Sequence, residues 1–159
     1  TPRALHGRCT RDYLYRLWRG TMTKPAYAKP LPELTVPMKP YWEGLRQRRV
    51  MIQVCEDCGR FRFPAASVCP QCLSDESHWE QVSGKGRLVS VATFHKAYWP
   101  SFAADIPYSV IQVELDVGVN VYSNWFGSPP AHAAEGTPVV AQFEPVSDDI
   151  TLLKFQLTE

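Results

Sequence analysis

Two Cys-x-x-Cys pairs near the middle of the chain constrain its fold more than any other feature. Cys55 and Cys58 form the first pair, and Cys69 and Cys72 form the second after ten intervening residues. A Cys-x-x-Cys turn directs two thiolates toward one point, and two such turns supply the four sulfur ligands of a tetrahedral metal site. Because all four positions are cysteine, no coordination position is left for water. We therefore expect one structural Zn2+ per chain rather than a catalytic one.

The residues around the cysteines agree with two metal-binding knuckles. Gly59 follows the first pair, where the backbone reverses, and Pro70 stiffens the turn of the second pair. Two disulfides or a redox-active pair are the alternatives. A thioredoxin-like motif, however, is a single pair at a strand-to-helix junction, and the sequence around these cysteines has no βαβ pattern. A small metal module buries little apolar surface, so we expect loss of the metal to unfold it.

Charge is distributed unevenly along the chain, although the net charge is only +1. Residues 1–87 hold 15 Lys and Arg against 8 Asp and Glu, whereas residues 88–159 hold 2 against 8. Such polarity can orient a partner or attract an anion to one end. No stretch approaches the roughly 18 apolar residues of a membrane helix, and no charged-then-apolar leader opens the sequence. Together with an all-cysteine zinc site, this predicts a cytoplasmic protein with no membrane association.

Three segments are expected along the chain. Residues 1–38 are rich in proline toward their end and are predicted to form an extended, partly disordered arm. Residues 39–80 are predicted to hold a short helix, over Lys39–Val50, and the zinc ribbon. Short strands are expected on either side of the first cysteine pair, at Met51–Val54 and Arg60–Pro64.

The last segment, residues 81–159, has the alternating pattern of short strands. The expected strands are Arg87–Lys96, Tyr108–Asp116, Val119–Phe126, Pro138–Glu144 and Ile150–Leu157. Five short strands with one longer connection fit a small closed barrel of the OB type, and an SH3-like barrel is the alternative. The predicted fold class is therefore mainly β: an arm and short helix, a zinc ribbon, then a five-stranded OB-fold barrel.

A series of motifs in one order resembles the DUF35 family. The series is Pro40-Tyr41-Trp42-x-Gly44-Leu45, Ile52-Gln53-x-Cys55-x-x-Cys58-Gly59, Phe63-Pro64, Cys69-Pro70-x-Cys72 and Ser83-Gly84-x-Gly86. The resemblance runs from about Pro32 to the C-terminus, whereas Val119–His132 and Thr1–Met22 depart from the family pattern. Members of this family pair a rubredoxin-like zinc ribbon with an OB-fold. They are companions of thiolase-superfamily enzymes, including acetyl-CoA acyltransferases, HMG-CoA-forming systems and lipid-transfer-protein-like aldolases.

The resemblance implies a non-catalytic accessory subunit in a hetero-oligomer with a thiolase-superfamily enzyme. That enzyme would be an acyltransferase, thiolase or retro-aldolase acting on acyl-CoA thioesters and would carry the catalytic residues. This chain would support assembly, with acyl-CoA at the shared interface. The sequence itself has no nucleophile elbow, P-loop or dinucleotide fingerprint, and its four histidines lack metal-ligand spacing. We therefore expect no catalytic residue in this chain.

Two sets of side chains are candidates for contacts with a partner and a substrate. The docking set consists of apolar residues on the predicted helix and in the most aromatic loop: Tyr41, Trp42, Leu45, Trp99 and Phe102. The phosphate set consists of basic residues in or beside the zinc module that suit the phosphates of coenzyme A: Arg60, Arg62, Lys85 and Arg87. The structural alternatives are aromatic residues that plug the barrel end and a solvated basic face.

Two other functions stay open on sequence alone. Zinc ribbons and OB barrels both bind nucleic acid, and this chain has basic and aromatic residues that could do so. The acidic excess of residues 88–159 argues against this function, because a groove across such a barrel would repel phosphate. The other possibility is a purely structural subunit that stabilises its partner without touching the substrate.

Overall fold

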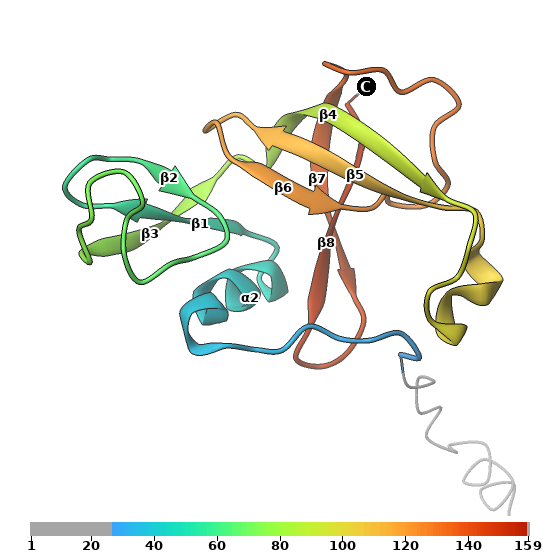
Figure 1. Cartoon of the computed structure of the whole chain (residues 1–159), viewed down its shortest axis with the longest axis horizontal. Helices are drawn as coiled ribbons and strands as arrows, with labels where there is room; N and C mark the ends of the chain where they lie inside the picture. The colour runs from blue at the N-terminus through green and yellow to red at the C-terminus, as the bar shows by residue number, and fades with distance from the viewer. Residues whose placement is uncertain (1–26, 159) are drawn as a thin grey trace, which may run out of the picture.

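The computed structural model describes residues 27–158, and the part of the predicted arm before residue 27 lies outside this range. The chain runs through an extended arm into the 3-10 turn η1 (Val36–Met38) and the helix α2 (Lys39–Arg46). Pro40 lies in the first turn of α2, where a missing N–H breaks no helical hydrogen bond. A three-stranded ribbon follows, and then a five-stranded sheet (Figure 1). Within the described range, no helix is long and apolar enough to cross a bilayer.

The ribbon is an antiparallel sheet in which the strand order is β2-β1-β3. Its strands are β1 (Val50–Cys55), β2 (Phe61–Arg62) and β3 (Ser77–Val82). Strand β1 pairs with β3 along its whole length, from Val50 opposite Val82 to Cys55 opposite Ser77. The sequence pattern predicted β1 and β2 but not β3. The helix also ends earlier than predicted, at Arg46.

The second sheet contains all five predicted strands. They are β4 (Lys85–Phe94), β5 (Tyr108–Leu115), β6 (Asn120–Ser123), β7 (Pro138–Pro145) and β8 (Thr151–Leu157), with the 3-10 helix η2 (Pro100–Asp105) between β4 and β5. The order β6-β5-β4-β7-β8 curls into a half-barrel of the OB type. In the described chain its edge strands meet through one isolated bridge between Trp125 and Phe155. There the N–H of Phe126 donates to the Phe155 carbonyl at 2.8 Å. The predicted closed barrel is therefore a curled sheet whose edges meet at this bridge and at a 2.7 Å hydrogen bond from Ser123 Oγ to the Leu153 carbonyl.

One continuous apolar core joins the helix, the ribbon and the half-barrel. Leu45 of α2 and Ile52 of β1 are fully buried and belong to the same cluster as Ile111 of β5 and Phe155 of β8. Helix α2 lies below the junction of the two sheets in Figure 1 and contacts β1, β7 and β8. The position of the metal-binding tip is therefore set by packing against the half-barrel.

Candidate metal centre

Both cysteine knuckles use the same backbone geometry. The N–H of Gly59 donates to the carbonyl of Cys55 at 2.9 Å, and the N–H of Leu73 donates to the carbonyl of Cys69 at 2.9 Å. Gly59 and Leu73 both have left-handed backbone conformations, with φ of 67° and 63°. The N–H of each first cysteine also donates to a carbonyl five residues later, at 3.0 and 2.7 Å. This repeated turn presents each pair of thiols to the other pair.

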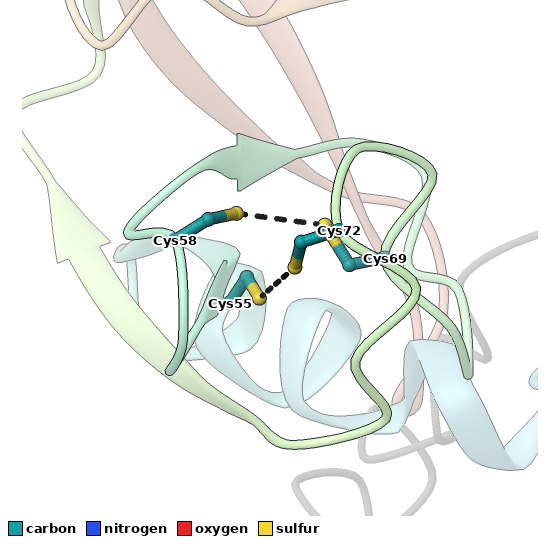
Figure 2. Close-up of side chains that lie close together, drawn as sticks. All are labelled: Cys55, Cys58, Cys69 and Cys72. Atoms are coloured by element: carbon teal, nitrogen blue, oxygen red, sulfur yellow. Dashed lines mark hydrogen bonds between the residues drawn. The ribbon is translucent and has the colours of Figure 1, made fainter.

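Four sulfur atoms converge between the two knuckles (Figure 2). The Sγ atoms of Cys55 and Cys72 are 3.5 Å apart, and those of Cys58 and Cys69 are 3.7 Å apart. All four lie within 4.8 Å of one another. A tetrahedral metal about 2.3 Å from each sulfur requires S–S separations of about 3.8 Å, whereas a disulfide requires about 2.05 Å. The four cysteines are therefore placed so that they could hold one metal ion, and the disulfide alternative does not fit this arrangement.

Backbone N–H groups favour the thiolate at the first cysteine of each knuckle. A hydrogen bond from the Cys72 backbone lowers the pKa of the Cys69 thiol to about 6, and one from the Cys58 backbone lowers the pKa of Cys55. At Cys72, a hydrogen bond from the Ser74 backbone lowers the pKa. Desolvation and the neighbouring thiols outweigh it and raise the pKa to about 12. Because thiolates this close repel one another, a bound cation is what would allow all four to ionise.

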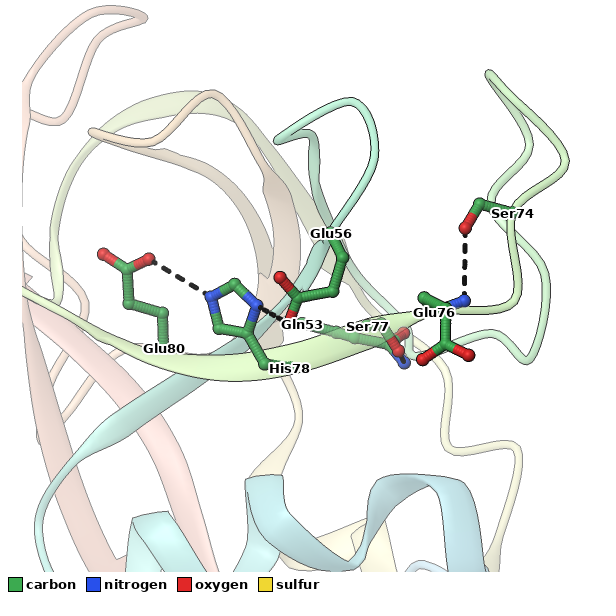
Figure 3. A network of polar contacts seen from close by, with 7 residues as sticks. All are labelled: Gln53, Glu56, Ser74, Glu76, Ser77, His78 and Glu80. Carbon is green, nitrogen blue, oxygen red and sulfur yellow. Dashed lines mark hydrogen bonds and ion pairs between the residues drawn. The ribbon is translucent and has the colours of Figure 1, made fainter.

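Polar contacts fasten the first knuckle to strand β3 (Figure 3). Gln53 Nε2 donates to Ser77 Oγ at 2.8 Å on the buried side of the ribbon. On the exposed side of the ribbon, His78 Nδ1 lies 2.7 Å from Glu56 Oε1, and His78 Nε2 lies 3.9 Å from Glu80 Oε2. The Gln53–Ser77 and Glu56–His78 contacts hold β1 and the knuckle in register with β3, so the first two sulfurs keep their positions relative to the sheet.

The predicted docking set is divided between core and surface. Tyr41 and Leu45 are buried in the chain's own core, with 6% and 0% of their surface exposed. This corrects the prediction for these two side chains: they join the helix to the sheets and are not available to a partner. Trp42 is partly exposed and packs edge-to-face on Tyr41 with ring centroids 5.0 Å apart. Trp99 is 59% exposed, and Phe102 is half-buried against Tyr108.

Three members of the predicted phosphate set are exposed and lie around one turn. Arg60 lines a groove between the first knuckle and the β5–β6 turn, and Lys85 and Arg87 line a second groove on the sheet side of that turn. The two grooves share Gly118. The fold therefore brings Arg60 to the same turn as Lys85 and Arg87, which lie 25 and 27 positions later in the sequence.

Arg62, the fourth member of the phosphate set, is buried. Only 7% of its surface is exposed, its Nε donates to Gln53 Oε1 at 2.7 Å, and its Nη2 donates to the Ala66 carbonyl at 3.1 Å. Its own chain thus covers most of Arg62, although Arg62 is among the residues that line the groove beside Arg60. The charge pattern suggested an exposed residue, but pairing of β2 with β1 turns the side chain inward.

Several exposed apolar residues were missed by the sequence analysis. Val36 is 86% exposed, Leu73 is 77% exposed and Tyr122 is 74% exposed. Leu73 carries a sequence signal that could have been used, because it follows the second cysteine pair at the place that Gly59 takes after the first. At this turn position the Leu73 side chain is mostly exposed to solvent.

Comparisons with known proteins agree with this architecture. The family models described as "ChsH2, rubredoxin-like zinc ribbon domain" and "ChsH2, C-terminal OB-fold domain" match residues 42–77 and 79–144. The fold and the four-cysteine site thus define a zinc-ribbon/OB-fold protein. More particularly, the chain belongs to the DUF35 family. A DUF35 domain-containing scaffold protein of Methanothermobacter thermautotrophicus is 30% identical over 110 residues, which cover 68% of this chain and 82% of that protein.

Two further proteins are similar over most of this chain. The probable enoyl-CoA hydratase alpha subunit of Thermomonospora curvata is 31% identical over 136 residues, which cover 86% of this chain but 42% of the relative. The chain therefore spans less than half the length of that subunit. A solved structure described as an Ltp2-ChsH2(DUF35) aldolase is 30% identical, with a TM-score of 0.71, and the match covers 80% of this chain and 98% of that one.

Proposed function

We propose that this chain is a non-catalytic accessory subunit of a thiolase-like enzyme that acts on acyl-CoA thioesters. The observation that carries the proposal is the similarity, over 98% of the solved chain, to the DUF35 component of an aldolase complex. Relatives described as a scaffold protein and as a hydratase alpha subunit support the same role. The partner, an acyltransferase, thiolase or retro-aldolase, supplies the nucleophile or base.

We propose further that the metal is one structural Zn2+ per chain. A tetrahedral set of four thiolates suits zinc or iron, and the match to a zinc-ribbon family model favours zinc. The bound ion would cross-link the two knuckles without an open coordination position. Four reduced cysteines suit the cytoplasm, where we place the protein. Metal analysis of the purified protein tests this assignment, because an iron-thiolate centre would be strongly coloured and a zinc centre would be colourless.

The arm and helix α2 form the proposed docking surface for the enzyme. Leu34 is 49% exposed and Val36 is 86% exposed in the arm, and Trp42 follows on α2 with part of its ring exposed. Apolar side chains in succession on a surface segment are typical of a protein interface, and Trp is the side chain most often found at its energetic centre. Trp99 and Phe102 of the η2 region are a second candidate contact.

The groove beside Arg60 is the proposed place where this chain meets the phosphates of coenzyme A. Its lining includes Arg60, the largely covered Arg62 and Asn120, and it includes no acidic residue. The neighbouring groove of Lys85 and Arg87 also contains Glu114 and Asp116, which weaken its attraction for an anion. Arg60→Ala is therefore expected to raise the KM for acyl-CoA while leaving the complex intact. An unchanged KM would favour a purely structural subunit.

Isolation of the natural complex tests the proposed function. The tagged chain is purified from its source organism at natural abundance, and proteins that accompany it in fixed proportion are identified by mass spectrometry. A thiolase-superfamily protein in stoichiometric amount is the expected result. Recovery of nucleic acid or ribosomal proteins instead would support the nucleic-acid-binding alternative and contradict the accessory role.

A further inference from the structure

Arg62 is a buried cation that has no anionic partner among residues 27–158. None of the ion pairs in this range includes it. Two of its nitrogens have neutral acceptors, on Gln53 and Ala66, and its Nη1 is buried with no hydrogen-bond partner. A buried charge is costly unless an opposite charge lies near it. The fold therefore places a positive charge at a buried position where no carboxylate of the described residues lies close enough to pair with it.

Strand pairing places Arg62 on the face of the ribbon from which Cys55 projects, and Arg62 lines the same groove as Cys58. Arg62 lies directly opposite Gln53 of β1, and paired residues project from the same face of a sheet. Cys55 lies two residues beyond Gln53, so its thiol projects from that face as well. Ala66, the other partner of Arg62, belongs to the segment that leads into Cys69. The guanidinium thus connects the strand before the first knuckle to the loop before the second.

We propose that Arg62 is the built-in counter-charge of the metal-thiolate centre. Four thiolates around a divalent cation carry a net charge of −2, and a guanidinium on the same buried face offsets part of it. The same side chain holds the loop before Cys69 through its hydrogen bond to Ala66. Arg62 is a positioning residue and not a ligand. The inference rests on the proposed metal occupancy, but it does not depend on the identity of the partner enzyme.

Zinc affinity of the full chain tests this role. Arg62→Met removes the charge with little change in length, and Arg62→Lys retains the charge but loses the planar fork. Arg87→Met is the matched control, because Arg87 is exposed on the half-barrel and donates to the Gly136 carbonyl, away from both knuckles. In competition with a chromophoric chelator, Arg62→Met is expected to weaken zinc binding about 10- to 100-fold. The zinc affinity of Arg62→Lys should stay within a few-fold of that of the natural chain, and the zinc affinity of Arg87→Met should equal it.

Replacement of zinc by cobalt gives a charge-transfer absorption band whose wavelength would not change if Arg62 had a purely structural role. Removing a nearby positive charge raises the energy of the sulfur electrons, so the thiolate-to-cobalt charge-transfer band should shift to longer wavelength in Arg62→Met but not in Arg62→Lys. If Arg62→Met and Arg62→Lys lose zinc affinity equally and the cobalt band does not shift, Arg62 does not act as a counter-charge. A zinc affinity of Arg62→Met within twofold of that of the natural chain would also overturn the counter-charge role. If the Met variant does not fold, Arg62→Gln and Arg62→Lys give the same comparison. A natural chain that binds neither ion would instead contradict the proposed metal.

Discussion

Leu73 occupies in the second knuckle the backbone position that Gly59 occupies in the first. Both residues are left-handed, with φ of 63° and 67°, and both donate a 2.9 Å hydrogen bond to the first cysteine of their pair. Glycine adopts this conformation freely, whereas a leucine there is strained by about 1–2 kcal/mol. Because Leu73 is 77% exposed, burial within the chain does not offset the strain. Strain at an exposed apolar residue is typical of a functional contact.

Leu73→Gly should therefore stabilise the metal-loaded chain. We expect the free energy of unfolding to rise by up to about 1 kcal/mol, because relief of strain exceeds the added freedom of the unfolded chain. Gly59→Ala is the control. A Cβ at position 59 meets nothing within 4 Å, so only the backbone conformation changes, and a loss of about 1 kcal/mol is expected. Urea titration measures both. If Leu73→Gly destabilises the chain, the exposed Leu73 side chain makes stabilising contacts that outweigh the backbone strain.

The junction between ribbon and half-barrel should tolerate no side chain at Gly84. A Cβ there would lie 2.8 Å from Ala141 Cβ and 3.3 Å from Val50 Cγ2, and φ is +71°. Gly118 has a similar φ of +76° but open space around it. Gly118→Ala should therefore cost about 1 kcal/mol of unfolding free energy, and Gly84→Ala about 1–3 kcal/mol more. Equal melting temperatures for the two variants would mean that the residues around position 84 move to accept a Cβ without loss of stability.

Removal of the metal should unfold the ribbon and leave most of the half-barrel folded. With a chelator, amide hydrogen exchange in β1–β3 is expected to accelerate strongly, because four uncompensated thiols replace the cross-link. Cys58→Ser should have the same effect and should abolish association with the enzyme. Exchange in β5 and β8 should change less, since both strands are hydrogen-bonded within the half-barrel. A zinc-free Cys58→Ser chain that still binds its partner would contradict the account of the ribbon.

Trp42→Ala should weaken the complex without unfolding the chain. Its ring is partly exposed, so we expect the Kd for the enzyme to rise at least tenfold while the melting temperature changes by only a few degrees. Leu45→Ala is the contrasting variant. Leu45 is completely buried, and its truncation should lower the free energy of unfolding by about 2–5 kcal/mol. If calorimetry finds the same affinity for Trp42→Ala as for the natural chain, the helix does not belong to the interface.

Stability should fall at alkaline pH through Tyr41. Burial raises the pKa of its phenol above the ordinary value of 10, so the folded state keeps the proton that the unfolded state loses. Stability from this residue is fully present below pH 10 and decreases as the pH rises above 10. Tyr41→Phe should flatten that part of the profile of melting temperature against pH. A profile that the substitution leaves unchanged would show that another group causes the alkaline loss.

Much of the fold could be predicted because its signals are local. Alternation of apolar residues indicated all five strands of the half-barrel, and the cysteine spacing indicated the knuckles. Strand β3 was missed because His78 and Glu80 give it no simple apolar alternation, and its stability comes from pairing with β1. The point of closure at Trp125 and Phe155 depends on residues 30 positions apart, which no local pattern connects.

The sequence could predict those parts of the candidate site that depend on residue type. It could not predict the parts that depend on whether a side chain is buried. Four cysteines at this spacing have few uses other than metal binding. An apolar helix face, by contrast, can meet either its own core or a partner, and Tyr41 and Leu45 meet the core. A charged residue is normally exposed, yet the β1–β2 register buries Arg62. Only the three-dimensional structure separates these cases.

Native mass spectrometry of the complex purified from its source organism tests the central claim most directly. The account predicts one mass that contains this chain, a thiolase-superfamily enzyme and one zinc ion per copy of this chain, and predicts dissociation when the zinc is removed. Recovery of this chain alone with its zinc in place, or a complex that persists after the metal is gone, would contradict it.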